Sequence, residues 1–189
     1  AYARLPAIIV SLAMMEAARG LALLYTGGYP LSGLPTEFQT LGRGFMFDHP
    51  MIPIPAVIML ITYGIAYVVL NHTPFGRYVF ALGDNEEAAH LSGVNTRVVK
   101  LYVYAISGFT AALGGLVLTS RLMSGQPNSG AGFELDAIAS VVLGGTDIAG
   151  GRGSIVGTLI GALTMGVLNN GLNLMGVSPY VLRVVKVLN

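Results

Sequence analysis

Gly-Arg-Tyr-Val-Phe-Ala-Leu-Gly-Asp-Asn-Glu-Glu-Ala-Ala-His-Leu-Ser-Gly, residues 76–93, is a charged segment between two long apolar runs. Asp84 can cap a helix, and Glu87 three residues later fits a capping box. Glu86 and Glu87 then lie at the positive end of the helix dipole, and Gly93 is a typical helix terminator. The pattern predicts a helix of roughly two turns from Asp84 to Ser92, far below the roughly 20 residues that a bilayer span needs.

A helix this short is marginal by itself in water, so it needs a surface to pack against. The best surface for such packing consists of Ala88, Ala89, Leu91 and Ser92, whose side chains are small enough to let a partner approach closely. Two interpretations are open at this point. The segment is a docking element for a soluble partner on the aqueous side of a membrane protein, or it is an ordinary loop between two spans.

The composition is that of a membrane protein. The 189 residues include 26 glycines, 53% are hydrophobic and only 10% are charged, with a mean hydropathy of +0.69. A net charge of +1 from scattered residues gives no basic patch for nucleic acid, and zero cysteines exclude disulfides and thiolate metal sites. His49, His72 and His90 have no metal-ligand spacing. We predict no catalytic site, no metal and no cofactor.

Four apolar stretches have the length of a membrane span: residues 5–24, 51–70, about 101–120 and about 154–174. Residues 25–50 are too rich in Gly and Pro to be a span, and residues 121–136 also have the pattern of a loop. The sequence after Val181 resembles the start of a further apolar helix. We therefore expect one transmembrane domain over residues 1–189 that is part of a longer chain.

A fifth apolar piece, residues 137–149, is too short for a straight span and is interrupted by Gly144-Gly145. This pattern predicts a discontinuous helix with its break buried in protein. Residues 150–154, Gly-Gly-Arg-Gly-Ser, lack the Lys and the preceding strand of a phosphate loop, so we expect a tight turn. Gly153, Gly157 and Gly161 repeat every four residues and predict a groove for another helix.

Ionisable and amide side chains inside the spans are candidates for a substrate path. Glu16 and Arg19 lie three residues apart on one helix face, where they either line a translocation path or form an ion pair that fixes the helix. Asn169, Asn170 and Asn173 either bind a hydroxylated substrate or connect helices by hydrogen bonds. Both alternatives remain open for each group.

The positive charges predict the orientation of the chain. Residues 71–100 contain Arg77, Arg97 and Lys100, whereas residues 25–50 contain only Arg43. The positive-inside rule therefore places the charged segment in the cytoplasm. Alternation of the spans then places Arg4 and Arg152 on the same side, and residues 25–50 and 121–136 on the opposite side.

Several motifs together resemble one family. These are Thr73-Pro74-Phe75-Gly76-Arg77, Ala81-Leu82-Gly83-Asp84-Asn85-Glu86-Glu87-Ala88-Ala89, Leu91-Ser92-Gly93-Val94-Asn95, Ser32-Gly33-Leu34-Pro35, Glu134-Leu135-Asp136-Ala137-Ile138-Ala139, Val142-Leu143-Gly144-Gly145-Thr146 and Asn169-Asn170-Gly171-Leu172-Asn173. The combination covers about residues 5–187 and is similar to the permeases of bacterial sugar ABC importers of the ribose, xylose and galactose type. The family also contains branched-chain amino acid permeases.

The resemblance implies an all-α, polytopic transmembrane helix bundle with a broken helix and a short cytoplasmic coupling helix within residues 72–100. It implies a homodimeric inner-membrane subunit that works with ABC ATPase subunits and a periplasmic sugar-binding protein. Family members have further spans before residue 1 and complete the last helix after residue 189. The coupling residues that it implies are Gly83, Asp84, Asn85, Glu86, Glu87, Ala88, Ala89, Leu91, Ser92 and Gly93. The alternatives are a branched-chain amino acid permease and an ATP-independent channel or secondary transporter.

Overall fold

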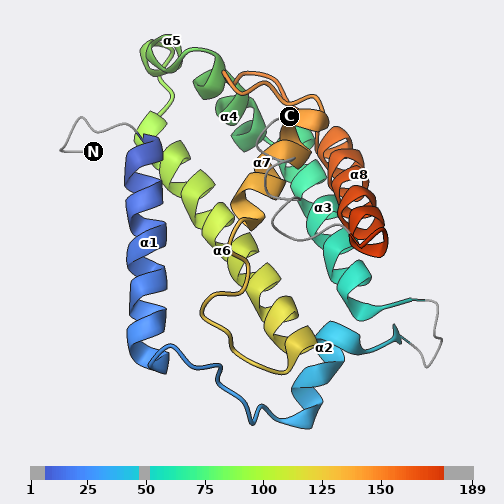
Figure 1. The fold of residues 1–189 in the computed structure, drawn as a ribbon. Coiled ribbons are helices and arrows are strands. Elements are labelled where there is room, and N and C mark those ends of the chain that lie inside the picture. The colour runs from blue at the N-terminus through green and yellow to red at the C-terminus, as the bar shows by residue number, and fades with distance from the viewer. Residues whose placement is uncertain (1–6, 47–51, 177–189) are drawn as a thin grey trace. The chain divides into compact units, whose positions relative to one another are not determined.

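The computed structural model describes residues 7–46 and 52–176, and within these ranges the regular structure is helical. Figure 1 shows the ribbon. The elements in chain order are α1 (Ala7–Thr26), the 3-10 helix η1 (Thr36–Phe38), α2 (Gln39–Arg43), α3 (Ile54–His72), α4 (Pro74–Asp84), α5 (Glu86–Leu91), α6 (Thr96–Leu122), α7 (Phe133–Leu143) and α8 (Ile155–Leu174). The prediction of an all-α membrane protein is confirmed.

Four of the described helices, α1, α3, α6 and α8, are long and apolar enough to cross a membrane. They contain 20, 19, 27 and 20 residues, so at about 1.5 Å per residue they extend roughly 30 to 40 Å. They coincide with the four predicted spans. The predicted start of the first span, residues 47–51 at the end of the predicted loop and the start of the second span, and the apolar segment after Val181 lie outside the described residues.

One compact unit contains residues up to Ile58 together with Phe109–Ala131. The backbone groups of Leu31 and Gly125 exchange two hydrogen bonds of 2.9 Å. The Ser120 hydroxyl donates to the Phe38 carbonyl, and the Arg43 Nε atom donates to the Arg121 carbonyl over 2.9 Å. The two loops that alternation of the spans places on the same side are therefore in contact.

The second unit contains Met59–Gly108 and the described residues from Gly132 onward. Within it α7 and α8 pack against each other (Figure 1), and they run antiparallel because Ser140 lies near Gly161 and Gly144 lies near Gly157. The predicted discontinuous helix is corrected: α7 ends at Leu143, where Gly145 has a φ of +84°, but no helix resumes until α8, and Gly145 is exposed rather than buried. The predicted loop 121–136 is shorter than expected, because α7 already begins at Phe133.

Few side chains are buried in the described part of the chain. Its buried hydrophobic residues are Ala89 and Val99, whereas Leu24 on α1 and Val167 on α8 are 81% and 74% exposed. Exposed apolar side chains along helices of this length are what lipid tails or further helices would cover. The long helices therefore present surfaces suited to a bilayer and to a larger bundle.

Candidate functional site

The charged segment begins with a helix that the sequence reasoning did not predict. Thr73 caps α4, with its hydroxyl accepting from the Gly76 N–H over 3.4 Å, and Pro74 occupies the first helical position. Pro is favoured there because its missing N–H has no helical partner to lose. The pair Thr73-Pro74 was the sequence signal that could have revealed α4.

The cap of the short helix is one residue later than predicted. Asp84 is the last residue of α4, and the N-cap of α5 is Asn85, whose Oδ1 atom accepts from the Ala88 N–H over 2.9 Å. The predicted Asp84–Glu87 capping box is therefore wrong. With Asn85 as the N-cap, the third helical residue is Ala88, whose side chain cannot accept a hydrogen bond, so no capping box forms.

The C-terminus of α5 is where the glycine predicts it. Gly93 has a φ of +86°, and its N–H donates to the His90 carbonyl over 3.0 Å. The Val94 N–H donates to the Ala89 carbonyl over 3.1 Å, which completes a Schellman motif. The Ser92 hydroxyl also donates to the Ala88 carbonyl over 2.8 Å. The six residues of α5 are thus capped at both ends by neighbouring residues of the same segment.

The two faces of α5 have different environments. Ala89 is only 5% exposed, whereas Leu91 is 81% exposed and Glu86, Glu87, Ala88 and Ser92 are also exposed. The predicted contact surface is therefore corrected for Ala89, which packs within its own chain. The remaining small and apolar groups stay available to a partner.

A salt bridge connects α5 to the start of α6. The Lys100 ammonium lies 2.6 Å from a carboxylate oxygen of Glu86, with both side chains about half exposed. Thr96 and Val99, in the first turns of α6, are buried. These contacts hold α5 beside the N-terminus of the long helix.

A groove of about 360 Å³ lies beside this region. Phe75 and Tyr102 meet edge to face there, with ring centroids 6.2 Å apart. The groove is lined by Phe75, Tyr78, Ser92, Gly93, Val94, Asn95, Val98, Val99 and Tyr102. Sequence reasoning missed it because residues from α4, the turn after α5 and α6 form it together.

The glycine-rich segment after α7 is a turn, as predicted. The Asp147 N–H donates to the Arg152 carbonyl over 3.0 Å, and the Ala149 N–H donates to the Asp147 carboxylate over 2.9 Å. Gly150 and Gly151 lie against Gly83 at the end of α4. This contact puts the turn beside the charged segment, as alternation of the spans predicts.

Of the three glycines predicted to form a packing groove, two contact α7 or the residue that follows it, and the third does not. A Cβ atom on Gly157 would collide with the Gly144 carbonyl, and one on Gly161 would collide with the Ser140 carbonyl. Gly153 precedes α8 and lies against the Thr146 side chain instead. The α7–α8 contact is therefore formed by Gly157 and Gly161.

The candidate path residues are divided between the two units, with Glu16 and Arg19 in the first unit and the three asparagines in the second. Glu16 and Arg19 form an ion pair of 3.1 Å on α1, with side chains 64% and 28% exposed. On α8, the Asn169 amide donates to the Asp136 carboxylate of α7 over 3.4 Å, whereas Asn170 and Asn173 are exposed. Sequence reasoning missed this contact because the two residues are 33 positions apart and on different helices.

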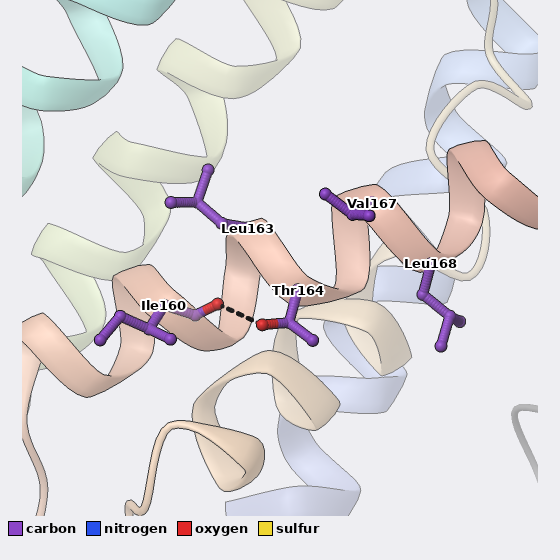
Figure 2. Close-up of a pocket in the computed structure, with 5 residues that line it drawn as sticks. All are labelled: Ile160, Leu163, Thr164, Val167 and Leu168. Carbon is purple, nitrogen blue, oxygen red and sulfur yellow. Dashed lines mark hydrogen bonds between the residues drawn. The ribbon is translucent and has the colours of Figure 1, made fainter.

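Beyond the glycine contact, α8 carries a wide apolar surface (Figure 2). Ile160, Leu163 and Val167 are 60%, 54% and 74% exposed, and the Thr164 hydroxyl donates to the Ile160 carbonyl over 2.8 Å. The predicted groove accounts for the glycine face of α8, whereas the described residues of its own unit leave these apolar side chains uncovered. Among the described residues, no group of three or more His, Asp or Glu residues could hold a metal ion.

Comparison with known proteins identifies the chain's relatives. The family described as "Branched-chain amino acid transport system / permease component" matches residues 1–188. The chain is 53% identical over 180 residues to the ribose import permease protein RbsC of Bacillus subtilis (strain 168), covering 94% of this chain and 55% of the relative. It is 50% identical over 187 residues to RbsC of Escherichia coli (strain K12), covering 98% and 58%.

The L-arabinose transport system permease protein AraH of Escherichia coli (strain K12) is 38% identical over 183 residues, covering 97% of this chain and 55% of the relative. The chain thus spans just over half the length of these curated relatives. No solved structure matches it. The resemblance seen in the sequence motifs is confirmed, and the family and the apolar helices place the chain in the bacterial inner (plasma) membrane. The chain is a transporter component rather than an enzyme, and it belongs to the permease family of the ribose and L-arabinose import systems and the branched-chain amino acid transport systems.

Proposed function

We propose that the protein is the membrane subunit of an ATP-binding cassette importer that carries a monosaccharide across the inner membrane. In this proposal residues 1–189 are part of a single permease domain. Separate ATPase subunits supply the energy, a periplasmic sugar-binding protein delivers the substrate, and a second copy of the permease completes the pathway in the bilayer. The observation that carries the proposal is α5, a short helix with a capped start and an exposed surface between two apolar helices.

The geometry of α5 supports its role as the coupling helix for the ATPase. A docking helix must keep its shape without a partner, and the Asn85 cap and the Gly93 terminator provide this. It must also offer contact area, which Leu91 at 81% exposure and the small side chains of Ala88 and Ser92 provide. Gly83 and Asp84 belong to α4 and are proposed to act behind α5 rather than in the docking surface.

Two considerations support a neutral sugar as the substrate. The relatives with 53% and 50% identity are named as ribose import permeases, and the one with 38% identity is named for L-arabinose. In addition, an anionic substrate would favour fixed cationic groups, and the described spans are poor in them. Asn169, Asn170, Asn173, Glu16 and Arg19 remain candidate path residues, and ribose is the first sugar to test.

The proposed mechanism is alternating access. ATP closes the ATPase pair, α5 moves with the subunit to which it is docked, and the helix bundle opens toward the other side of the membrane. Each conformational state is stabilised by the contacts that it makes with the ATPase or with the loaded binding protein. The permease itself then needs only weak affinity for sugar, because the binding protein captures it.

The test is a matched pair of substitutions at Ala88 in the complete permease. Ala88→Arg adds a bulky charge to the exposed face and should abolish co-purification of the ATPase while leaving membrane insertion intact. Ala88→Ser keeps the residue small and should retain the complex and ATP-driven sugar uptake. Normal assembly and uptake in Ala88→Arg would contradict the docking role of α5.

A second measurement addresses the alternatives. Proteoliposomes that contain the permease and its ATPase are supplied with a ribose-loaded or a leucine-loaded binding protein from the same organism. The proposal expects ATP-dependent uptake of the sugar. Uptake of leucine instead would identify an amino acid permease, and sugar uptake without the ATPase would identify a channel or a secondary transporter.

A further inference from the structure

We propose that Gly83, Gly150 and Gly151 form a close-packed backbone joint that passes movement of α5 to the α7–α8 hairpin. This inference rests on the proposed function, because it assigns a path for the force that α5 receives. It concerns residues that lie behind the proposed docking surface of α5. Their role is positioning.

The first step is the distance between the two backbones. A Cβ atom on Gly83 would lie 2.7 Å from the Gly151 backbone nitrogen, and one on Gly150 would lie 2.5 Å from the Gly83 carbonyl oxygen. A Cβ atom on Gly151 would lie 3.0 Å from a carboxylate oxygen of Asp84. These separations leave no room for a side chain, so the end of α4 rests directly on the turn.

The second step is the short connection between this joint and α5. Asp84 ends α4, Asn85 is the one residue between the helices, and α5 begins at Glu86. The Asn85 N–H donates to the Ala81 carbonyl over 3.0 Å, and its side chain caps α5. The same residue is therefore bonded to both helices, and a displacement of α5 acts on the end of α4.

The third step is the stiffness of the turn at residues 147–152 and of the α7–α8 hairpin that it connects. The turn is cross-linked by the Asp147 N–H to Arg152 carbonyl bond of 3.0 Å and by the Gly150 N–H to Asp147 carbonyl bond of 3.1 Å. Beyond it α7 and α8 touch through Gly157 and Gly161 without intervening side chains. Close-packed contacts have low compressibility and transmit strain. The hairpin should thus move as one body with the turn.

The test compares two helical glycines in the complete transporter, reconstituted in proteoliposomes with its ATPase and its sugar-binding protein. Gly83→Ala places a methyl group in the joint. Gly108→Ala is the control, because Gly108 is in α6 and nothing lies within 4 Å of the position that its Cβ atom would take. We expect Gly83→Ala to assemble with the ATPase but to lower the sugar molecules imported per ATP hydrolysed at least fivefold. We expect Gly108→Ala to stay within twofold of the wild type.

Hydrogen exchange on the wild-type complex provides a readout that does not depend on a variant. Adding ATP should change the protection of amides at residues 83–85 and at residues 147–152 together. A change at the first segment alone, or an unaltered import per ATP in Gly83→Ala, would refute the joint. A wild-type complex with no ATP-dependent uptake would instead refute the proposed function itself, so the two failures are distinguishable.

Discussion

Gly161 provides the most direct test of how α7 and α8 are held together. It is the buried residue of α8, and a Cβ atom there would collide with the Ser140 carbonyl and lie 3.0 Å from the Gly144 nitrogen. Both obstacles are backbone atoms of α7 and the residue that follows it, which cannot rotate away as a side chain would. Gly161→Ala should therefore force the two helices apart.

The magnitude follows from two opposing effects. Overpacking a close contact costs about 1–3 kcal/mol, whereas replacing a helical Gly by Ala contributes up to about 1 kcal/mol of helix propensity. The net destabilisation of Gly161→Ala should therefore be at most about 2 kcal/mol. Gly166 is in the same helix, and a Cβ atom there would have nothing within 4 Å, so Gly166→Ala should be neutral or stabilising by up to about 1 kcal/mol.

The assay is unfolding of the complete permease in mixed micelles by increasing SDS, followed by circular dichroism. The midpoint of Gly161→Ala should fall below that of the wild type, and the midpoint of Gly166→Ala should equal or exceed it. Equal midpoints for the two variants would refute the inference that α7 and α8 touch through their backbones at this position.

Three further predictions concern α5. Asn85→Ala removes the bond to the Ala88 N–H and should weaken the helix by about 1 kcal/mol, seen as faster hydrogen exchange confined to α5; unchanged exchange would contradict the cap. Gly93→Ala places a Cβ at a φ of +86° and should cost about 1–2 kcal/mol of local stability, measured by the same exchange experiment. The half-exposed Glu86–Lys100 pair should have a coupling energy below about 1 kcal/mol in a double-mutant cycle, decreasing in high salt; a larger, salt-independent value would contradict a solvated pair.

Much of the fold could be predicted from the sequence because lipid imposes a strong rule on length and polarity. The four long apolar helices follow from that rule. The terminator Gly93 follows from the freedom of glycine at positive φ. These signals depend on local sequence alone.

The cap of α5 could not be decided locally. Asp84 and Asn85 are equally good N-caps, and the choice depends on where α4 ends. Similarly, the start of α7 follows Gly132, which has a φ of +91° and no side chain to signal a cap. The cap of α5 is one residue later than predicted, and α7 begins four residues earlier, at Phe133 instead of residue 137.

The contacts between segments distant in sequence were also beyond local reasoning. The meeting of Gly83 with Gly150 and Gly151, the Asp136–Asn169 hydrogen bond and the burial of Ala89 depend on how the elements pack. Glycine runs indicate that close approach is possible, but they do not specify the partner.

The central claim is that the exposed face of α5 lies in the cytoplasm and is covered by an ATPase. Leu91→Cys, in a complete permease without other cysteines, is labelled with a membrane-impermeant maleimide in inverted and in right-side-out vesicles. The account predicts labelling only from the cytoplasmic side, and strong protection once the ATPase is bound. Labelling from the periplasmic side, or equal labelling with and without the ATPase, would contradict it.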